Sequence, residues 1–366
     1  SIQNGRPICP LEIPLKLLTR HLNDAIQDTV YLQELMHKLQ NGFSRKLGTE
    51  TALRLLTTVL NIRAHQGQAT HVAYLDLASA FNSVPHWAVR QAMERFNVPE
   101  WAITLMMQID DGGLTQVITD HGLTEPFPEE SGTRQGCILS PIKFVMWADA
   151  LLTWLDELED DITIPSQHAK LPARAIRAIF FADDMALISS NQRQLQNTLD
   201  RVHLFLSYYG VAIQERKSYY TTNEAGFRPR TADGEGHGLF FFRQRRKVWL
   251  RGVAADMAVK YLGLHIAVDG NSRVQLAHMH EQLSTCLADL RKSPLPLPLQ
   301  TLMLAGKLGG MLGYSLPFVH VRQAVLLNWL ARVQQFGKHT LRLHAHTPPE
   351  QFTAHVNAQG FGLLHI

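Results

Sequence analysis

The stretch that decides the fold runs Ala178-Ile179-Phe180-Phe181-Ala182-Asp183-Asp184-Met185-Ala186-Leu187-Ile188-Ser189. Two short apolar runs flank a pair of aspartates, which predicts a tight hairpin with both acids near its tip. An ionised carboxylate beside buried strands is costly unless a base or a metal ion compensates its charge, and no basic residue stands close to Asp183 in the sequence. The alternative is an ordinary solvated turn, because aspartate is common in turns.

A third aspartate ends another apolar run, Val72-Ala73-Tyr74-Leu75-Asp76, and no Lys or Arg lies within five positions of it. Three carboxylates at strand ends suit hard divalent ions such as Mg²⁺, which take oxygen ligands and leave positions for substrate phosphates. Two such ions about 4 Å apart can stabilise the attacking and leaving oxygens of a phosphoryl transfer. Asp76, Asp183 and Asp184 are therefore candidate metal ligands.

Two further segments could contact a nucleotide. In Gly132-Thr133-Arg134-Gln135-Gly136-Cys137-Ile138-Leu139-Ser140-Pro141, the glycines allow close backbone approach, Gln135 offers amide groups, and Ser-Pro starts a helix. Phe81 follows Asp76 by five positions and could wall off one side of a nucleotide's sugar. The plainer alternatives are a loop before a helix and a core phenylalanine.

Composition limits the class of protein. The 366 residues are 45% apolar and 18% charged, which suits about two domains with a real core and excludes global disorder. No apolar run reaches the ~18 residues of a membrane span, so no membrane partner is expected. The three cysteines have no paired spacing and are expected to be reduced intracellular thiols.

Charge and pattern divide the chain near residue 270. Strand-like and helical patterns alternate before it, whereas the last third is helical by pattern, which predicts an α+β body followed by a helical lobe. Residues 271–366 carry eight Lys or Arg and three acids, and residues 1–270 carry a small negative net charge. A basic lobe suits a polyanion, although a solvated basic surface is the plainer interpretation.

Taken in order, three segments resemble core motifs of reverse transcriptases. They are Asp76 with Ala80-Phe81, Arg134-Gln135-Gly136 with Ser140-Pro141, and Phe181-Ala182-Asp183-Asp184. Other blocks are similar to flanking motifs of that family: Arg6-Pro7-Ile8 with Lys16 and Arg20, Gln40-Asn41-Gly42-Phe43, Gly210 with Lys217, and Tyr261-Leu262-Gly263. The ending Gly360-Phe361-Gly362-Leu363 resembles the end of the thumb in polymerases of non-LTR retrotransposons, especially the site-specific, LINE-like type.

The resemblance implies a right-hand polymerase of the α+β class. Residues 1–270 would form the fingers and a palm with an antiparallel sheet and helices, and residues 271–366 would form a helical thumb. The implied activity is that of an RNA-directed DNA polymerase, a nucleotidyltransferase that extends a primer with dNTPs by two-metal phosphoryl transfer. The alternatives are a catalytically silent, domesticated scaffold that binds nucleic acid, and an intron-encoded maturase.

The resemblance also assigns roles to residues. Asp76 and Asp183 would hold two Mg²⁺ ions, or Mn²⁺ in their place, with the Leu77 carbonyl as a further ligand and Asp184 as the second acid of the pair. The implied nucleotide contacts are Phe81 as a gate against a 2′-hydroxyl, Gln135, Gly136, and Lys217 at the leaving pyrophosphate. Arg6, Lys16 and Arg20 would be basic fingers positions that reach the triphosphate or the template. Tyr261, Leu262 and Gly263 would be the primer grip.

The implied partners are an RNA template, a DNA or RNA primer, and dNTPs, in an intracellular, nuclear setting. The oligomeric state has no signal in the sequence. Asn82 and Cys137 depart from the aspartates of many relatives, but neither is a metal position. No ribonuclease-H quartet of acids follows the thumb, so any endonuclease or DNA-targeting part of a parent element would lie outside this chain.

One segment, Phe240-Phe241-Phe242-Arg243-Gln244-Arg245-Arg246-Lys247-Val248-Trp249, mixes rings and basic groups. Such a mixture can contact phosphates and stack on bases. A hairpin with one wet face and one packed face is the equal alternative. The sequence does not decide between them.

Overall fold

The computed structural model describes residues 11–340, except 33–34, 44–46, 112–113, 129–130, 134–135, 160–161, 165–173 and 231–235. The chain divides into two compact units, Ser1–Ala255 and Asp256–Ile366. The predicted division into fingers and palm at 1–270 and thumb at 271–366 stays a prediction. Within the described residues, no helix is both long enough and apolar enough to cross a membrane.

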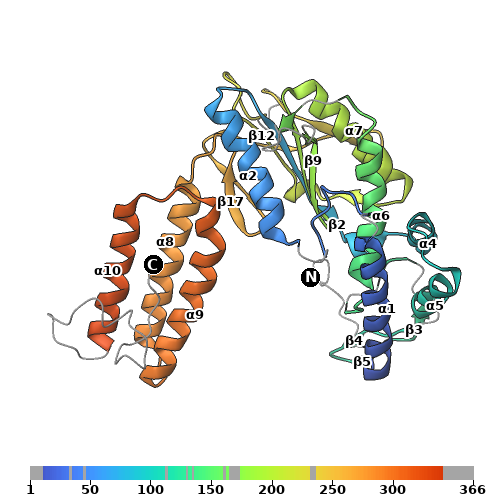
Figure 1. Cartoon of the computed structure of the whole chain (residues 1–366), viewed down its shortest axis with the longest axis horizontal. Helices are drawn as coiled ribbons and strands as arrows, with labels where there is room; N and C mark the ends of the chain where they lie inside the picture. Colours follow the sequence, from blue (N-terminus) through green and yellow to red (C-terminus); the bar gives the residue numbers. More distant parts are fainter. Residues whose placement is uncertain are drawn as a thin grey trace. The chain divides into compact units, whose positions relative to one another are not determined.

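The first unit is built on a five-stranded sheet (Figure 1). In sheet order its strands are β15 (Arg251–Val253), β12 (Tyr219–Thr222), β1 (His71–Leu75), β10 (Asp184–Ser189) and β9 (Ala178–Phe181). The pairings of β9, β10, β1 and β12 are antiparallel, and only β15 runs parallel to its neighbour. Every residue of β1 is buried, which explains why this strand is a continuous apolar run and does not alternate.

Helices of the first unit pack on this sheet and on one another. Those of the first unit are α1 (Ile13–Leu32), α2 (Thr49–His65), α3 (Ala80–Ser83), α4 (His86–Arg95), α5 (Glu100–Asp111), α6 (Ser140–Leu155) and α7 (Gln192–Tyr208). In Figure 1, α2 and α7 flank the strands, where α2 contacts β9 and α7 contacts β10 and β1. The helix α7 begins at Asn191, whose side chain accepts a hydrogen bond from the Gln194 amide, as a preferred N-cap residue does.

Short strand pairs complete the first unit. They are β2 (Leu77–Ala78) with β11 (Ala212–Ile213), β3 (Leu114–Thr115) with β6 (Phe127–Pro128), β4 (Ile118–Thr119) with β5 (Gly122–Leu123), β7 (Thr163–Ile164) with β8 (Arg174–Ala175), and β13 (Phe240–Arg243) with β14 (Arg246–Trp249). The pair β2–β11 matters most for function, because β2 directly follows Asp76.

As far as residue 340, the second unit consists of a hairpin and a bundle of three α-helices. The hairpin pairs β16 (Ala258–Tyr261) with β17 (Leu264–Ala267), and the helices are α8 (Arg273–Lys292), α9 (Leu297–Ser315) and α10 (Gln323–Thr340). The bundle core includes Leu283, Leu308 and Trp329. The predicted helical character of the last third is therefore confirmed as far as residue 340.

Contacts fix the hairpin to these helices. The His265 amide donates to Gln275 Oε1 at 2.9 Å, and the Tyr314 hydroxyl donates to the Leu262 carbonyl at 2.6 Å. Burial lowers the pKa of His265, so its ring is uncharged at neutral pH. The hairpin and the helices thus form one packed body.

An ion pair with both partners buried lies in the core of the first unit. Lys143 on α6 and Asp110 on α5 are both almost fully buried, and their charged atoms lie 2.7 Å apart. The Lys143 ammonium also donates to the Met106 carbonyl at 3.3 Å. Buried pairs add little net stability, but removal of one partner leaves an uncompensated charge in the core.

We therefore expect Lys143→Met to lower the free energy of unfolding by about 3–5 kcal/mol, as measured by urea denaturation. The double variant Lys143→Met, Asp110→Leu removes both charges and should recover most of that loss. A single variant as stable as the unsubstituted chain would show that this pair is not buried as described.

Candidate active site

The three predicted carboxylates lie where the inner strands β1 and β10 meet the end of the five-stranded sheet. We call this end of the sheet the carboxylate edge. Leu75, the last residue of β1, pairs with Met185, so Asp76 directly follows β1 at the end where Asp184 begins β10. Asp184 also pairs with Phe181, so Ala182 and Asp183 form a two-residue turn between β9 and β10. Asp76, Asp183 and Asp184 are each partly exposed. The structure thus brings together residues that lie far apart in the sequence.

The turn has a backbone that side chains rarely adopt. Ala182 has a φ of 54°, in the left-handed region. A two-residue hairpin turn needs such a conformation, and non-glycine residues take it only when the surroundings hold them there. Contacts from outside the hairpin supply that support.

A segment that precedes α2 holds the turn, and we call residues 37–43 the strap. The Asn41 amide donates to the Phe180 carbonyl at 2.8 Å, and the Phe180 amide donates to the Leu39 carbonyl at 2.9 Å. Gln40, which is fully buried, accepts at Oε1 from the amides of Ala182 at 3.2 Å and Gly42 at 2.9 Å. One side chain therefore ties the strap to the turn that carries Asp183.

Gly42 lies directly against the same turn. A Cβ atom built on Gly42 would lie 2.4 Å from the Ala182 amide nitrogen, closer than any real contact. Only glycine lets the two backbones approach in this way. In the sequence, residues 40–43 stood out only because they resemble a motif of reverse transcriptases. The contact between Gly42 and the aspartate turn is seen only in the structure.

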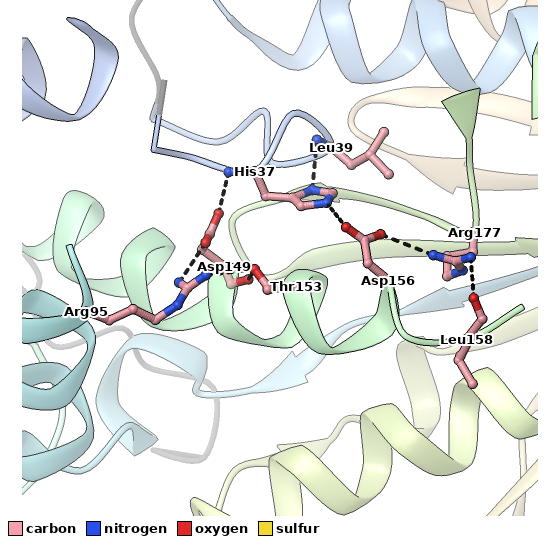
Figure 2. A network of polar contacts seen from close by, with 8 residues as sticks. All are labelled: His37, Leu39, Arg95, Asp149, Thr153, Asp156, Leu158 and Arg177. Carbon is pink, nitrogen blue, oxygen red and sulfur yellow. Dashed lines mark hydrogen bonds and ion pairs between the residues drawn. The ribbon is translucent and has the colours of Figure 1, made fainter. Parts of the chain in front are cut away.

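A polar network fixes the start of the strap (Figure 2). Asp149 on α6 is fully buried, and its two carboxylate oxygens have different partners. One accepts from the His37 amide at 2.6 Å, and the other accepts from Arg95 of α4 at 2.7 Å. Two helices and the strap therefore share one buried carboxylate.

The His37 ring extends this network towards β9. Its Nδ1 accepts from the Leu39 amide at 3.2 Å, and its Nε2 lies 2.9 Å from Asp156. Asp156 in turn accepts from Arg177 at 3.1 Å. Arg177 directly precedes β9. The network in Figure 2 therefore connects the strap, through His37 and Asp156, to the start of the strand that leads to the aspartate turn.

Asp76 is held by its backbone and faced by a base. Its amide donates to Ser218 Oγ at 3.2 Å, and its carbonyl accepts from the Gln214 amide at 2.8 Å. Lys217, at the end of the short 3₁₀ helix η2 (Glu215–Lys217), places Nζ 3.3 Å from Asp76 Oδ2. The lysine side chain is 67% exposed, so this ion pair is weak and easily exchanged. No Lys or Arg lies within five positions of Asp76 in the sequence, so its basic partner comes from a distant segment.

The donor chemistry of this edge suits a hard cation. Among the described residues, no group of three or more His, Cys, Asp or Glu side chains is gathered closely enough to hold a metal ion alone. Mg²⁺ commonly binds one or two carboxylates and takes its other ligands from water and substrate phosphates. Asp76 and Asp184, on neighbouring strands, fit that requirement with oxygen donors only.

Phe81 lies beside this edge within an aromatic group. Its ring stacks on Phe144 with 4.5 Å between centroids and meets Phe43 edge-on at 6.1 Å. Phe43 is also 6.2 Å from Phe181, the residue before the aspartate turn. The partly exposed Phe81 ring is thus connected to the strap and the turn through Phe43.

The glycine-containing loop starts beside Phe81. The Thr133 amide donates to the Phe81 carbonyl at 2.7 Å, and a Cβ on Gly132 would lie 2.6 Å from Asn82 Cα. Gly136 has a φ of 112°, a conformation that favours glycine. Gln135 lies outside the described residues, so its position relative to Phe81 is not assigned.

The remaining predicted positions lie on α1, on β2 and in the second unit, or outside the described residues. Arg6 lies outside the described residues, and Lys16 and Arg20 are exposed on α1, where neither side chain bonds to another described residue. Leu77 is buried on β2 and pairs with Ile213. Tyr261 is buried in the second unit, where Leu262 and Gly263 form the β16–β17 turn with φ values of 46° and 84°.

Comparison with known proteins identifies the family. The family described as "Reverse transcriptase (RNA-dependent DNA polymerase)" matches residues 2–266. The chain belongs to this family.

Two curated relatives of this reverse transcriptase domain are retrotransposon proteins. The "Retrovirus-related Pol polyprotein from type-1 retrotransposable element R2" of Popillia japonica is 26% identical over 367 residues, which cover 99% of this chain and 48% of the relative. The "type-2 retrotransposable element R2DM" polyprotein of Drosophila melanogaster is 25% identical over 287 residues, covering 78% of this chain and 26% of the relative. The predicted family, a non-LTR retrotransposon reverse transcriptase, is confirmed. The chain spans about half the length of the first relative and a quarter of the second.

A solved structure supports the predicted fold. The reverse transcriptase domain matches "Structure of apo telomerase from Candida Tropicalis" with a TM-score of 0.50 and 10% identity, over 88% of this chain and 54% of that one. The α+β, right-hand polymerase class is thereby confirmed.

The contact between Gly42 and Ala182 gives a direct test of the strap. Gly42→Ala forces a Cβ against a backbone amide, so we expect a loss of about 1–3 kcal/mol in unfolding free energy. Hydrogen exchange at the Ala182 amide should speed up. Gly48→Ala, which meets nothing within 4 Å, is the matched control. Equal behaviour of the two variants would contradict the close approach.

Proposed function

We propose that this chain copies RNA into DNA by adding deoxynucleotides to the 3′-hydroxyl of a primer. The observation that carries the proposal is the β1–β10 register, which brings Asp76 and Asp184 to the same end of neighbouring strands, with Asp183 in the adjoining turn. Carboxylates gathered at one partly exposed edge suit phosphoryl transfer, which depends on charge compensation and alignment. Membership of the reverse transcriptase family supports the same reaction.

Asp76, Asp183 and Asp184, with the Leu77 carbonyl, are the groups that would hold two Mg²⁺ ions, or Mn²⁺ in their place. When bound, such ions stabilise negative charge on the attacking and leaving oxygens. The strap keeps Asp183 and Asp184 in position through Gln40, so the turn need not reorganise when substrate arrives.

Lys217 has two successive roles in this proposal. Without substrate its ammonium offsets the charge of Asp76, from which it lies 3.3 Å away. When a nucleotide binds, the lysine leaves this weak pair and neutralises the pyrophosphate. Its high exposure supports such a movement, because little energy holds it in place.

The remaining contacts follow the family resemblance. Phe81 excludes a 2′-hydroxyl, and Gln135 and Gly136 contact the incoming nucleotide. Arg6, Lys16 and Arg20 bind triphosphate or template phosphates from the fingers. Tyr261, Leu262 and Gly263 grip the primer, and the helices after residue 271 serve as the thumb.

The proposed partners are an RNA template, a DNA or RNA primer and dNTPs, and the proposed location is the nucleus. In a parent element, the primer would be a nicked chromosomal strand. A silent scaffold would not need three acids at one edge, which favours the enzyme over that alternative.

Primer extension on an RNA template with Mg²⁺ tests the proposal. Asp183→Asn should slow extension by about a hundredfold or more, because it removes charge where the reaction needs it. Asp120→Asn changes an exposed carboxylate in the β4–β5 turn and should extend normally. Binding of primer–template should persist in both variants. Full extension by Asp183→Asn would overturn the proposal.

The Phe81 ring should decide sugar selectivity. Phe81→Val opens space beside the nucleotide sugar, so the ratio of ribonucleotide to deoxynucleotide incorporation should rise about tenfold or more. Phe127→Val removes another partly exposed ring and should leave the ratio unchanged. Steady-state incorporation of each nucleotide measures the ratio. An unchanged ratio in Phe81→Val would refute the gate.

A further inference from the structure

The β13–β14 hairpin has two unlike faces. Its register sets Phe240 opposite Trp249 and Phe242 opposite Lys247, so these four side chains share one face. Phe241 points to the other face, where it is buried with its ring 5.3 Å from that of His203 on α7. The packed face accounts for the fold of the hairpin, whereas on the other face Phe242 is exposed and Phe240 and Trp249 are half-buried.

The outer face is an array of rings and cations. Phe242 is 54% exposed, and Phe240 lies 5.7 Å from Phe242 and 5.1 Å from Trp249. Lys247 Nζ lies 3.6 Å from the centre of the Phe240 ring, and Arg230 lies 4.0 Å from that of Trp249. We call Phe240, Phe242, Trp249, Lys247 and Arg230 the aromatic face.

The hairpin itself carries charge of one sign, whereas acids such as Glu215 and Asp200 lie on neighbouring segments. Residues 239–251 contain five basic side chains and no acid. Arg243 is the one that pairs with a described acid, Glu215, at 2.9 Å. Arg245 lies in the hairpin turn, and Arg245, Arg246 and Lys247 are all exposed. This excess of unpaired positive charge complements a polyanion.

The hairpin is fixed to α7 before any partner arrives. The Phe240 amide donates to Gln196 Oε1 at 3.1 Å, and Gln196 Nε2 donates to the Phe240 carbonyl at 2.7 Å. This paired contact uses one side chain of α7 to hold the strand that carries two of the rings. A ligand would therefore meet a formed surface and would not have to order it.

A hollow of about 1010 Å³ lies between the aromatic face and the start of α7. Phe240 and Trp249 line one side of it, and Arg193 and Asn197 are among its α7 residues. The side chains of Arg193 and Asn197 make no hydrogen bond to the part of the chain that the structure describes. An amide and a guanidinium beside two rings offer both edge contacts and stacking to a base.

We propose that the aromatic face binds single-stranded RNA, as a contact additional to the carboxylate edge. Rings stack on the faces of unpaired bases, which a duplex does not present, and the basic side chains bind the phosphates between them. The choice of RNA over single-stranded DNA rests on the proposed function, because that function requires a single-stranded RNA template. The existence of the surface does not depend on that function.

The test measures the affinity of the whole chain for an unstructured 20-nucleotide RNA by fluorescence anisotropy, with EDTA and without dNTPs. Phe242→Leu keeps an apolar side chain but removes the ring, and should weaken binding about fivefold or more. Phe242→Tyr retains the ring and should bind normally. Trp101→Leu, at a ring that is 67% exposed on α5, is the control for loss of an unrelated aromatic side chain.

Charge is tested with Lys247→Met, which should also lower the salt dependence of binding by about 0.7 in the log–log slope. Phe242 and Lys247 are exposed, so we expect their substitution to leave the melting temperature unchanged. Melting temperatures equal to that of the unsubstituted chain would show that every variant folds. The same RNA carrying 5-iodouridine should cross-link to Phe242 or Trp249 on irradiation, located by mass spectrometry.

The proposal is supported if the variants lose at least as much affinity for RNA as for DNA of the same sequence. A loss of affinity for DNA alone would overturn the choice of RNA. Unchanged RNA affinity in both Phe242→Leu and Lys247→Met overturns the surface itself. The assay contains no nucleotide, so it does not depend on catalysis. Failure of the proposed function would appear separately, as absent primer extension by a chain that still binds RNA through this face.

Discussion

The pairing of β1 with β10 is the constraint on which the candidate site depends. Side chains alternate along a strand, so a shift of one residue would turn Asp184 to the opposite face and move Asp76 away from it. The register is set by buried residues on both strands, since all of β1 and nearly all of β10 lie in the core. Apolar packing therefore determines where the charged groups meet.

The carboxylates at this edge destabilise the fold, and contacts elsewhere in the structure offset that loss of stability. Carboxylates on neighbouring strands repel each other, and the Ala182-Asp183 turn adds an unfavourable backbone conformation. The strap opposes this strain because Gln40 accepts a hydrogen bond from the Ala182 amide, and the network around Asp149 fixes the strap to α6. Lys217 reduces the repulsion while remaining free to move. A rigid support with one mobile cation suits a site that must admit a charged substrate.

The sequence predicted what depends on local pattern. The aspartate hairpin, the apolar strand before Asp76 and the helices of the last third follow from runs and periodicity that nearby residues specify. Of the two interpretations of residues 240–249, the structure shows the hairpin with a packed face, on which Phe241 is buried, and the opposite face is compatible with the nucleic-acid interpretation.

What depends on long-range contact could not be predicted. Gln40 meets Ala182, Lys217 meets Asp76 and Lys143 meets Asp110 only because the chain brings distant segments together. No local pattern distinguishes a buried lysine from a solvated one on an apolar helix such as α6. The family resemblance marked Gln40 and Gly42, but it could not say which backbone they touch.

The central claim is that Asp76, Asp183 and Asp184 act together on divalent ions in a substrate complex. The most direct measurement is the number of Mn²⁺ ions bound, by electron paramagnetic resonance, in a complex with RNA template, chain-terminated primer and dNTP. We expect about two ions for the unsubstituted chain and fewer for Asp76→Asn. An equal count in both proteins, or no bound ion in either, would contradict the account.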